Sequence, residues 1–193
     1  ASTHNNEEEQ LLETHKLLAA TRPDLLTIIA PRHPQRGEEI AKLFSVHGKV
    51  ALRSHGDKIT TDTNFYIADT LGELGLFYRL SEIVFMGGSL IPHGGQNPLE
   101  PARLRCCIIT GTHTQNFVDM YGEMEKLTIC IRVQNASELA VQIDKLMQNS
   151  DVVTQMQMLT KEWLRIKSGA ADRILDTLAP IFVPVNSAYS QTK

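Results

Sequence analysis

The sequence has few of the features that mark membrane-spanning, disulfide-bonded or nucleic-acid-coating proteins. Its apolar runs are short and broken by polar residues, well below the roughly 20 apolar residues that a transmembrane helix needs. The cysteines, Cys106, Cys107 and Cys130, are an odd number with two adjacent members, which makes a poor disulfide framework. The formal net charge of -3 gives no support to a nucleic-acid partner. We therefore expect a soluble protein from a reducing compartment.

Metal-binding and targeting signals are also missing from the sequence. No Cys-x-x-Cys pair and no paired histidine spacing appears, so no zinc site is expected. Residues 1–9 are acidic and polar, unlike a signal or transit peptide, and the glutamates at 7–9 are expected to form a solvated first helical turn. With 193 residues, of which 42% are hydrophobic, the chain can bury the core of one domain.

Short apolar runs alternate with amphipathic stretches along most of the chain. Strands are expected at 25–30, 49–53, 65–68, 83–86, 107–110 and 127–131. Helices are expected at 7–20, 37–46 and 71–80, from Pro98 onward, and over most of 137–178. This alternation predicts an α/β fold with a Rossmann-like, doubly wound parallel sheet. Because the strands are apolar throughout, helices should cover both faces of the sheet.

The two ends of the chain depart from this pattern. A doubly wound domain usually begins with a strand, whereas this chain opens on a polar segment and a helix. We therefore expect that a first strand and a preceding domain are absent from this chain. Residues 181–193 include a proline and several small polar residues, so a flexible tail is expected there.

The first candidate site segment follows the strand at 25–30. In an open parallel α/β sheet, ligands bind beyond the carboxyl ends of the strands. Pro31 and Pro34 stiffen this turn, and Arg32 and Arg36 lie between the strand end and the next helix. A guanidinium together with free helix N–H groups would favour an anion. A proline-rich turn with solvated arginines is equally compatible with the spacing.

The second candidate segment, residues 69–74, follows the strand at 65–68. Asp69 or Thr70 suits a helix N-cap, and Thr70 with Glu73 three residues later fits a capping box. Gly72 would let a ligand approach the backbone closely. A capped helix without a ligand is the interpretation that the local sequence favours.

The third candidate segment, residues 86–102, is a glycine-rich loop that directly follows the strand at 83–86. Asn97 as N-cap, Pro98 at the first helical position and Glu100 at the third mark a helix start. The glycines allow backbone amides to face a bound anion. Glu100 either closes a capping box or reaches the hydroxyls of a ribose. A flexible surface loop is the less favoured alternative, because two glycine pairs flank one helix start.

These segments carry a resemblance to a known family. Residues 87–90 and 93–102 resemble the signature of 3-deoxy-D-manno-octulosonic acid (Kdo) transferases. Further motifs of the family are resembled, in the same order and spacing, by residues 2–4, 31–34, 69–74 and 116–117. The similarity covers about residues 1–180, and the glycine-rich segment is highly specific. Asn6 and Thr112 depart from the family, which usually has glycine at the first position and often proline at the second.

The resemblance implies one half of a two-domain GT-B glycosyltransferase. Residues 1–180 correspond to the C-terminal domain, which binds the nucleotide sugar CMP-Kdo. In the family, an N-terminal domain with a membrane-associated segment binds a lipid A precursor and carries the glutamate that acts as general base. The whole enzyme transfers Kdo with inversion and releases CMP, without a metal or other cofactor to hold the donor. It acts in lipopolysaccharide biosynthesis at the cytoplasmic face of the Gram-negative inner membrane.

The resemblance also assigns the residues that bind the donor. None of them is catalytic, and this chain alone is expected to be inactive because the acceptor domain and the base are missing. Arg32 matches an arginine near the anionic groups of the donor, whereas replacement of Arg53 is expected to leave donor use unchanged. The implied substrate-binding residues are Arg32, Gly72, Glu73, Leu74, Gly87, Gly88, Ser89, His93, Asn97 and Glu100.

Two other functions remain open on the sequence. A different GT-B enzyme, which uses a UDP-sugar or acts as an epimerase, would share the fold and the glycine-rich loop. Competition by UMP as strong as that by CMP would favour this alternative. The other is a non-catalytic nucleotide-sensing or interaction module, because no general base is evident in this chain.

Overall fold

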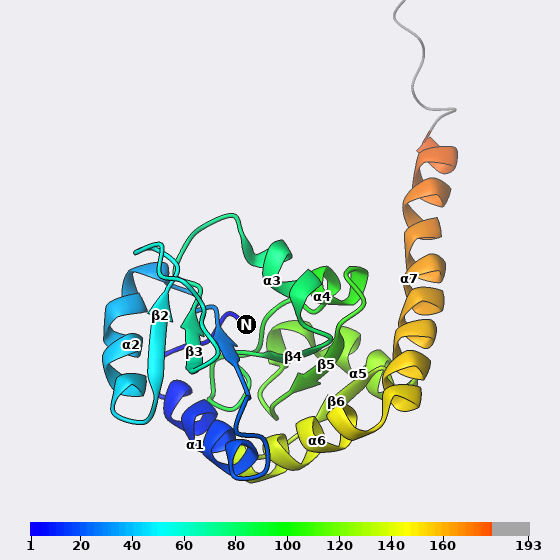
Figure 1. Ribbon diagram of the computed structural model, residues 1–193. Coiled ribbons are helices and arrows are strands. Elements are labelled where there is room, and N and C mark those ends of the chain that lie inside the picture. The colour runs from blue at the N-terminus through cyan, green and yellow to red at the C-terminus, as the bar shows by residue number, and fades with distance from the viewer. Residues whose placement is uncertain (179–193) are drawn as a thin grey trace, which may run out of the picture.

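The computed structural model describes residues 1–178, apart from the side chains of residues 169–176, so the expected tail at 181–193 lies outside the described residues. The strands are β1 (Thr27–Ile29), β2 (Lys49–Leu52), β3 (Thr63–Ile67), β4 (Ile83–Met86), β5 (Cys107–Thr110) and β6 (Cys130–Arg132). The helices are α1 (Glu8–Ala19), α2 (Gly37–Ser45), α3 (Leu74–Leu80), α4 (Leu99–Arg103), α5 (Val118–Lys126), α6 (Ala136–Gln148) and α7 (Ser150–Leu178). The end of α7 extends away from the body of the domain (Figure 1).

The strands form two parallel, three-stranded sheets in the orders β1-β3-β2 and β4-β5-β6. The N-terminus lies between the two sheets (Figure 1). On one side, the Ala1 amino group donates to the carbonyl oxygen of Phe85 (2.7 Å), and the Gly87 amide donates to the carbonyl oxygen of Ala1 (2.8 Å). On the other side, Thr3 forms an isolated parallel bridge with Pro31. The first residues thus join the two sheets into the doubly wound arrangement that the sequence predicts.

Helices cover both faces of the sheets, as the apolar strands predict. In the β1-β3-β2 sheet, Leu12 of α1 and Phe44 of α2 pack on one face, and Phe77 of α3 packs on the other. In the β4-β5-β6 sheet, α1 and α6 cover one face, and α3, α4 and α5 cover the other. Helix α7 contributes to both sides, through Met156 on the first face and Trp163 on the second.

Helix α3 and strand β6 begin later than expected, each after a residue with positive φ. Helix α3 begins at Leu74, later than the expected 71, because Gly72 has a φ of 80° and Glu73 is the N-cap. Strand β6 begins at Cys130, later than the expected 127, because Thr128 has a φ of 56° in the turn that follows α5. Neither helix nor strand geometry includes a left-handed residue, so both elements start after it.

The cysteines are buried and free, in agreement with the expectation that they form no disulfides. Burial raises the pKa of the Cys106 thiol to about 12 and that of the Cys107 thiol to about 11. Burial also raises the pKa of Cys130. These thiols are therefore protonated at neutral pH and behave as small apolar side chains.

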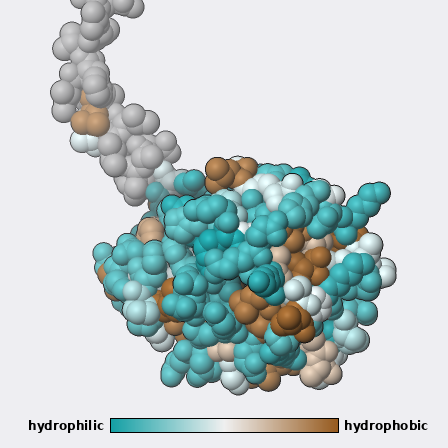
Figure 2. Space-filling view, turned by 90° about the vertical axis from the view of Figure 1, so that its left-hand side faces the viewer, coloured by the Kyte–Doolittle hydropathy of each residue, from teal (hydrophilic) through white to brown (hydrophobic). Residues whose placement is uncertain are grey.

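The face of the molecule that carries α2 and β2 is mainly hydrophilic, with apolar side chains gathered in small separate groups (Figure 2). Val46, at the end of α2, is one of the exposed apolar residues of the chain. Scattered apolar side chains of this kind are normal on a protein surface. Within residues 1–178, none of the helices combines the length and the apolarity that a bilayer crossing requires.

Candidate functional site

The loops that follow β1, β3 and β4 are brought to one edge of the domain, because parallel strands have their carboxyl ends on the same side. The segment that leads into α1 lies at this edge as well. Its Thr3 pairs beside β1, and its Glu7 contacts the loop after β4. The three segments predicted from the sequence therefore share one side of the domain, and the start of α1 connects two of them.

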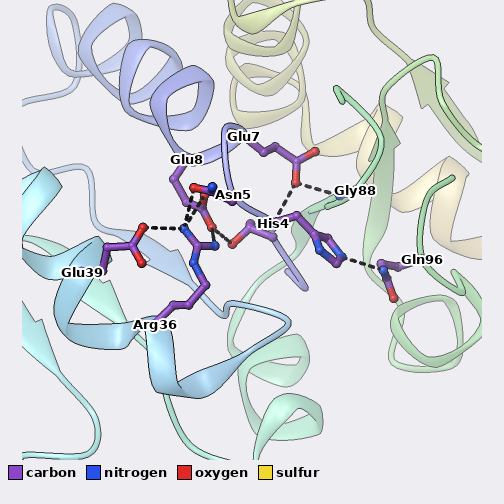
Figure 3. A network of polar contacts seen from close by, with 9 residues as sticks. His4, Asn5, Glu7, Glu8, Arg36, Glu39, Gly88 and Gln96 are labelled. Carbon is purple, nitrogen blue, oxygen red and sulfur yellow. Dashed lines mark hydrogen bonds and ion pairs between the residues drawn. The ribbon is translucent and has the colours of Figure 1, made fainter. Parts of the chain in front are cut away.

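The carboxylate of Glu7 is the anion that accepts hydrogen bonds from the backbone amides of the glycine-rich loop. Its side chain is fully buried, and its carboxylate accepts hydrogen bonds from the amides of Gly88 (2.7 Å), Ser89 (3.0 Å) and Leu90 (3.1 Å). The His4 amide also donates to it, at 3.3 Å. Figure 3 shows this carboxylate between His4 and Gly88. The expectation that Glu7 belongs to a solvated first turn is wrong, because three loop amides take the place of water.

Gly87 and Ser89 have internal roles in the same loop. A Cβ atom on Gly87 would lie 2.4 Å from the carbonyl oxygen of Ser2, so only glycine lets the N-terminal segment pass this closely. The Ser89 side chain is fully buried; its hydroxyl donates to Met86 (2.5 Å) and accepts from the Gly111 amide (2.7 Å). These residues hold the loop in shape, and their contact with a ligand remains a prediction.

A group of histidines lies beside the loop. The ring of His4 is buried and stacks on His93, with centroids 3.7 Å apart, while His33 approaches edge-on at 5.9 Å. A hydrogen bond of 3.0 Å joins the His4 Nε2 atom to the Gln96 side chain. Burial, together with the charges of His93, His33 and Arg32, lowers the pKa of His4 to about 4. His4 is therefore a neutral ring at pH 7, beneath side chains that reach the surface.

The two arginines of the first segment are used differently. Arg36 donates to the buried Glu8 carboxylate (2.8 Å), to Asn5 (3.3 Å) and to Glu39 (3.1 Å), as Figure 3 shows. Arg32 is exposed, and none of the described residues accepts a hydrogen bond or forms an ion pair with its guanidinium. Of the two arginines that the sequence offers for an anion, Arg32 is thus the available one.

Glu73, predicted from the second segment, is held by neighbours on the protein. The Arg53 guanidinium donates to it twice, at 2.6 and 3.0 Å, and the Thr70 hydroxyl donates at 2.5 Å. Arg53, and then Thr70, lower the pKa of Glu73 to about 2. The predicted capping box is wrong, because Thr70 bonds to the carboxylate and α3 has no side-chain cap. Because Arg53 bonds to a predicted site residue, its replacement is not a suitable control for the replacement of Arg32.

The remaining predicted residues lie around the starts of α3 and α4. Gly72 is exposed, and Leu74 is half-buried and packs against clusters of the core. The Asn97 side chain accepts a hydrogen bond from the Leu99 amide at 3.0 Å. It therefore caps the start of α4, although Pro98 occupies the N-cap position. The exposed Glu100 carboxylate lies next to Gly75, 3.5 Å from the position of a Cβ atom there, so it faces α3.

Sequence reasoning missed the two residues that organise this edge, His4 and Glu7. His4 belongs to a segment that resembles a family motif, which was a signal without an assigned role. Glu7 gave no signal, since its partners are 81 to 83 residues away along the chain. A glutamate at a helix start looks solvated unless its distant partners are known.

The free polar groups at this edge suit an anionic ligand. Arg32 carries a permanent positive charge, and His33 and His93 are exposed rings with N–H donors. We call these three residues, which surround the buried His4, the basic edge. Among the side chains that the structure describes, no group of histidine, cysteine and acidic residues is arranged to hold a metal ion. Guanidinium and imidazole groups recognise phosphate and carboxylate through charge-assisted hydrogen bonds.

A parallel α/β domain with such an edge has the fold of a GT-B glycosyltransferase domain. The crystal structure of the C-terminal CMP-Kdo binding domain of WaaA from Acinetobacter baumannii superposes with a TM-score of 0.81 and 32% identity, over 84% of this chain and 86% of that one. The chain belongs to the 3-deoxy-D-manno-octulosonic acid (Kdo) transferase family. No model of a protein family matches the chain.

Full-length relatives show how much of the family this chain spans. It is 35% identical to the 3-deoxy-D-manno-octulosonic acid transferase of Haemophilus influenzae, over 93% of this chain and 43% of that protein. It is 38% identical to a probable mitochondrial 3-deoxy-D-manno-octulosonic acid transferase of Arabidopsis thaliana, over 84% of this chain and 37% of that protein. The chain thus spans about two fifths of the length of these relatives.

Proposed function

We propose that residues 1–180 are the donor-binding domain of a Kdo transferase and bind the nucleotide sugar CMP-Kdo. The whole enzyme transfers Kdo to a lipid A precursor, with inversion at the anomeric carbon, and releases CMP. The observation that carries the proposal is the basic edge, in a domain with the fold of a CMP-Kdo binding domain. This chain alone is inactive, because the acceptor site and the general base belong to another domain of the enzyme.

The chemistry of the donor fits the basic edge. CMP-Kdo carries a phosphate and a carboxylate, and both are anions at neutral pH. The free guanidinium of Arg32 can donate two parallel hydrogen bonds to either group. His93 stacks on the ring of His4, and the charge of Arg32 is close enough to His4 to lower the pKa of that ring. Binding of these two anionic groups orients the sugar.

The predicted site residues divide into contacts and supports. We assign direct donor contact to Arg32, His93 and Glu100, the last through the ribose hydroxyls, because their side chains are exposed at the edge. The side chains of Asn97 and Ser89 form hydrogen bonds within the protein, so we assign them the role of positioning the loop that contacts the donor. Gly87, Gly88, Leu74, Gly72 and Glu73 shape the same edge.

The same guanidinium has a role in the transfer step. When the bond between the anomeric carbon of Kdo and the phosphate oxygen breaks, negative charge grows on the departing CMP. We assign to Arg32 the stabilisation of that charge, and no metal or other cofactor is required for this contribution. The full enzyme acts at the cytoplasmic face of the bacterial inner membrane, and contact with the membrane and the lipid acceptor is made by its other domain.

Calorimetric titration of this chain with CMP, and with UMP as the control, tests the proposal. We expect CMP to bind at least about tenfold more tightly than UMP, a difference of about 1.4 kcal/mol. Equal binding of the two nucleotides would contradict a cytidine donor and favour a UDP-sugar enzyme. Failure of both to bind would contradict the proposal that residues 1–180 contain the donor site.

A further inference from the structure

The ring of His4 is held in one orientation by its neighbours at the basic edge. The residue is only 8% exposed. His93 stacks on its ring, and His33 approaches the ring edge-on. The amide nitrogen of the Gln96 side chain lies 3.0 Å from the His4 Nε2 atom, and Figure 3 shows this contact between the start of the chain and the glycine-rich loop. Neither the position nor the rotation of the ring is therefore free.

Gln96 is itself anchored to the body of the domain. Its carbonyl oxygen accepts a hydrogen bond of 2.7 Å from the hydroxyl of Tyr121, a fully buried residue of α5. The amide of the preceding residue, Gly95, donates to the carbonyl oxygen of Gly88 at 2.8 Å. The Gln96 side chain thus reaches His4 from a fixed stretch of main chain.

The contact with Gln96 determines which ring nitrogen of His4 carries the proton. The nitrogen of a glutamine amide can only donate, so the His4 Nε2 atom accepts. A neutral imidazole has a single N–H group, which then lies at Nδ1. His4 is neutral at pH 7, because burial and the neighbouring charges lower its pKa to about 4.

The Nδ1–H group of His4 has no acceptor among the residues that the structure describes. A Cβ atom on Gly88 would lie 3.1 Å from the His4 Cδ2 atom and 3.5 Å from Nε2. The backbone of the glycine-rich loop therefore lies against that side of the ring, and Nδ1 is on the opposite side. A nearly buried donor without an acceptor is unfavourable and uncommon in proteins. A ligand that accepts a hydrogen bond at Nδ1 would remove this cost.

We propose that Gln96 fixes His4 as the Nδ1–H tautomer and that this N–H group donates a hydrogen bond to an anionic group of the ligand at the basic edge. His4 contacts the ligand, whereas Gln96 is a positioning residue that acts through His4. Because the ring is already fixed, little conformational entropy is lost when the ligand binds. The inference rests on the proposed function, in which that ligand is a cytidine nucleotide sugar, and CMP serves as the probe.

Nuclear magnetic resonance of the ring nitrogens tests the tautomer directly, because a protonated and an unprotonated ring nitrogen differ in their 15N signals. The chain is labelled with 15N-histidine and measured at pH 7, before and after addition of CMP. The spectrum of His4→Phe identifies the signals of His4. We expect the proton on Nδ1 in the free chain and a shift of the Nδ1–H signal when CMP binds. A proton on Nε2 in the free chain would overturn the inference.

Two variants of His4 separate the hydrogen bond from the packing of the ring. His4→Phe keeps a flat ring without a donor, whereas His4→Asn places an amide, which can donate, near the position of Nδ1. We expect His4→Phe to weaken CMP binding about tenfold, as measured by calorimetry, and His4→Asn to recover part of that loss. CMP binding by His4→Phe equal to that by the unaltered chain would contradict this inference and leave the proposed function intact.

The variant Gln96→Met tests the positioning role, because methionine has a similar length but no amide. The ring of His4 should then show both tautomers, and CMP binding should weaken by less than for His4→Phe. An unchanged Nδ1–H tautomer in Gln96→Met would overturn the role of Gln96. Thermal unfolding checks that each variant folds; if His4→Phe does not, the shift of the Nδ1–H signal in the unaltered chain decides. Failure of the unaltered chain to bind CMP would overturn the proposed function and the ligand contact of His4 together.

Discussion

The loop after β1 and the loop after β4 both carry groups that bind anions, but they differ in whether the protein itself supplies the anion. The β4 loop offers three backbone amides, and the buried Glu7 carboxylate occupies all of them. The β1 loop offers two arginines, of which Arg36 is neutralised by Glu8 and Arg32 is left without an acceptor among the described residues. The β4 loop is therefore complete within the protein, whereas the β1 loop has a free cation for a ligand.

A sequence pattern that favours anion binding does not show whether the anion comes from the protein itself or from a ligand. Glycines after a strand and an arginine before a helix both predict affinity for negative charge. Glu7 satisfies the first pattern from within, at no cost in translational freedom. Of these two patterns, only the second leaves a charge without a partner, at Arg32, that a ligand can meet, and this distinction can be tested from both sides.

The largest effect is expected from removal of the internal anion. Glu7→Ala leaves the amides of Gly88, Ser89 and Leu90 without an acceptor, and a buried donor without a partner costs about 1–3 kcal/mol. We expect the free energy of unfolding to fall by roughly 3 kcal/mol, and the Tm, measured by thermal unfolding, by about 6–12 °C. Glu13→Ala, at an exposed position of the same helix, is the control. Equal Tm values for both variants would show that the loop does not depend on this carboxylate.

A smaller effect, of a different kind, is expected at the β1 loop. Arg32→Ala should weaken CMP binding by about 10- to 100-fold, since hydrogen bonds to charged groups contribute about 1.5–3 kcal/mol, and leave the Tm unchanged. Arg36→Ala should instead lower the Tm, because it leaves the buried Glu8 carboxylate without its cation. Calorimetry and thermal unfolding of both variants provide the test. If Arg32→Ala binds CMP as tightly as the unaltered chain, the inference that the β1 loop holds a cation for a ligand is wrong.

A third effect, which depends on pH, is expected from the titration of His4. Its pKa is about 4 in the folded chain, below the ordinary 6.5, so the unfolded chain takes up a proton first as the pH falls. The stabilisation is complete above pH 6.5 and is lost between pH 6.5 and 4. Denaturant unfolding across this range should show a shallower loss of stability for His4→Asn than for the unaltered chain. Parallel curves would exclude His4 as the source of the pH dependence.

The order of strands and helices could be predicted because the apolar runs of a doubly covered parallel sheet are visible in the sequence. The runs that contain β4 and β5, which are apolar at nearly every position, gave the correct bounds. The starts of α3 and β6 could not be predicted, because Gly72 and Thr128 adopt positive φ values that only the fold requires. Local patterns show burial, whereas backbone conformation at a boundary depends on what lies next to it.

The candidate site was predicted as a set of segments and not as a set of contacts. Arg32 and His93 lie at the basic edge, and their contact with a donor, which the family resemblance implies, remains a prediction. The partner of Glu73 could not be foreseen, since Arg53 is 20 residues away and was expected to be unimportant. The same holds for Glu7 and the loop amides. Ion pairs and buried hydrogen bonds between distant segments leave no periodic trace in the sequence.

The position of the first residues has a consequence for the order of folding. Each three-stranded sheet comes from one continuous stretch of chain, 27–67 and 83–132. The contacts of Ala1 and Glu7 with the second stretch close loops of 84 and 81 residues. Closure of long loops carries the larger entropy cost, and non-local contacts form slowly. The two halves should therefore collapse first, and the N-terminal segment should dock last, as the step that commits the domain to its final shape.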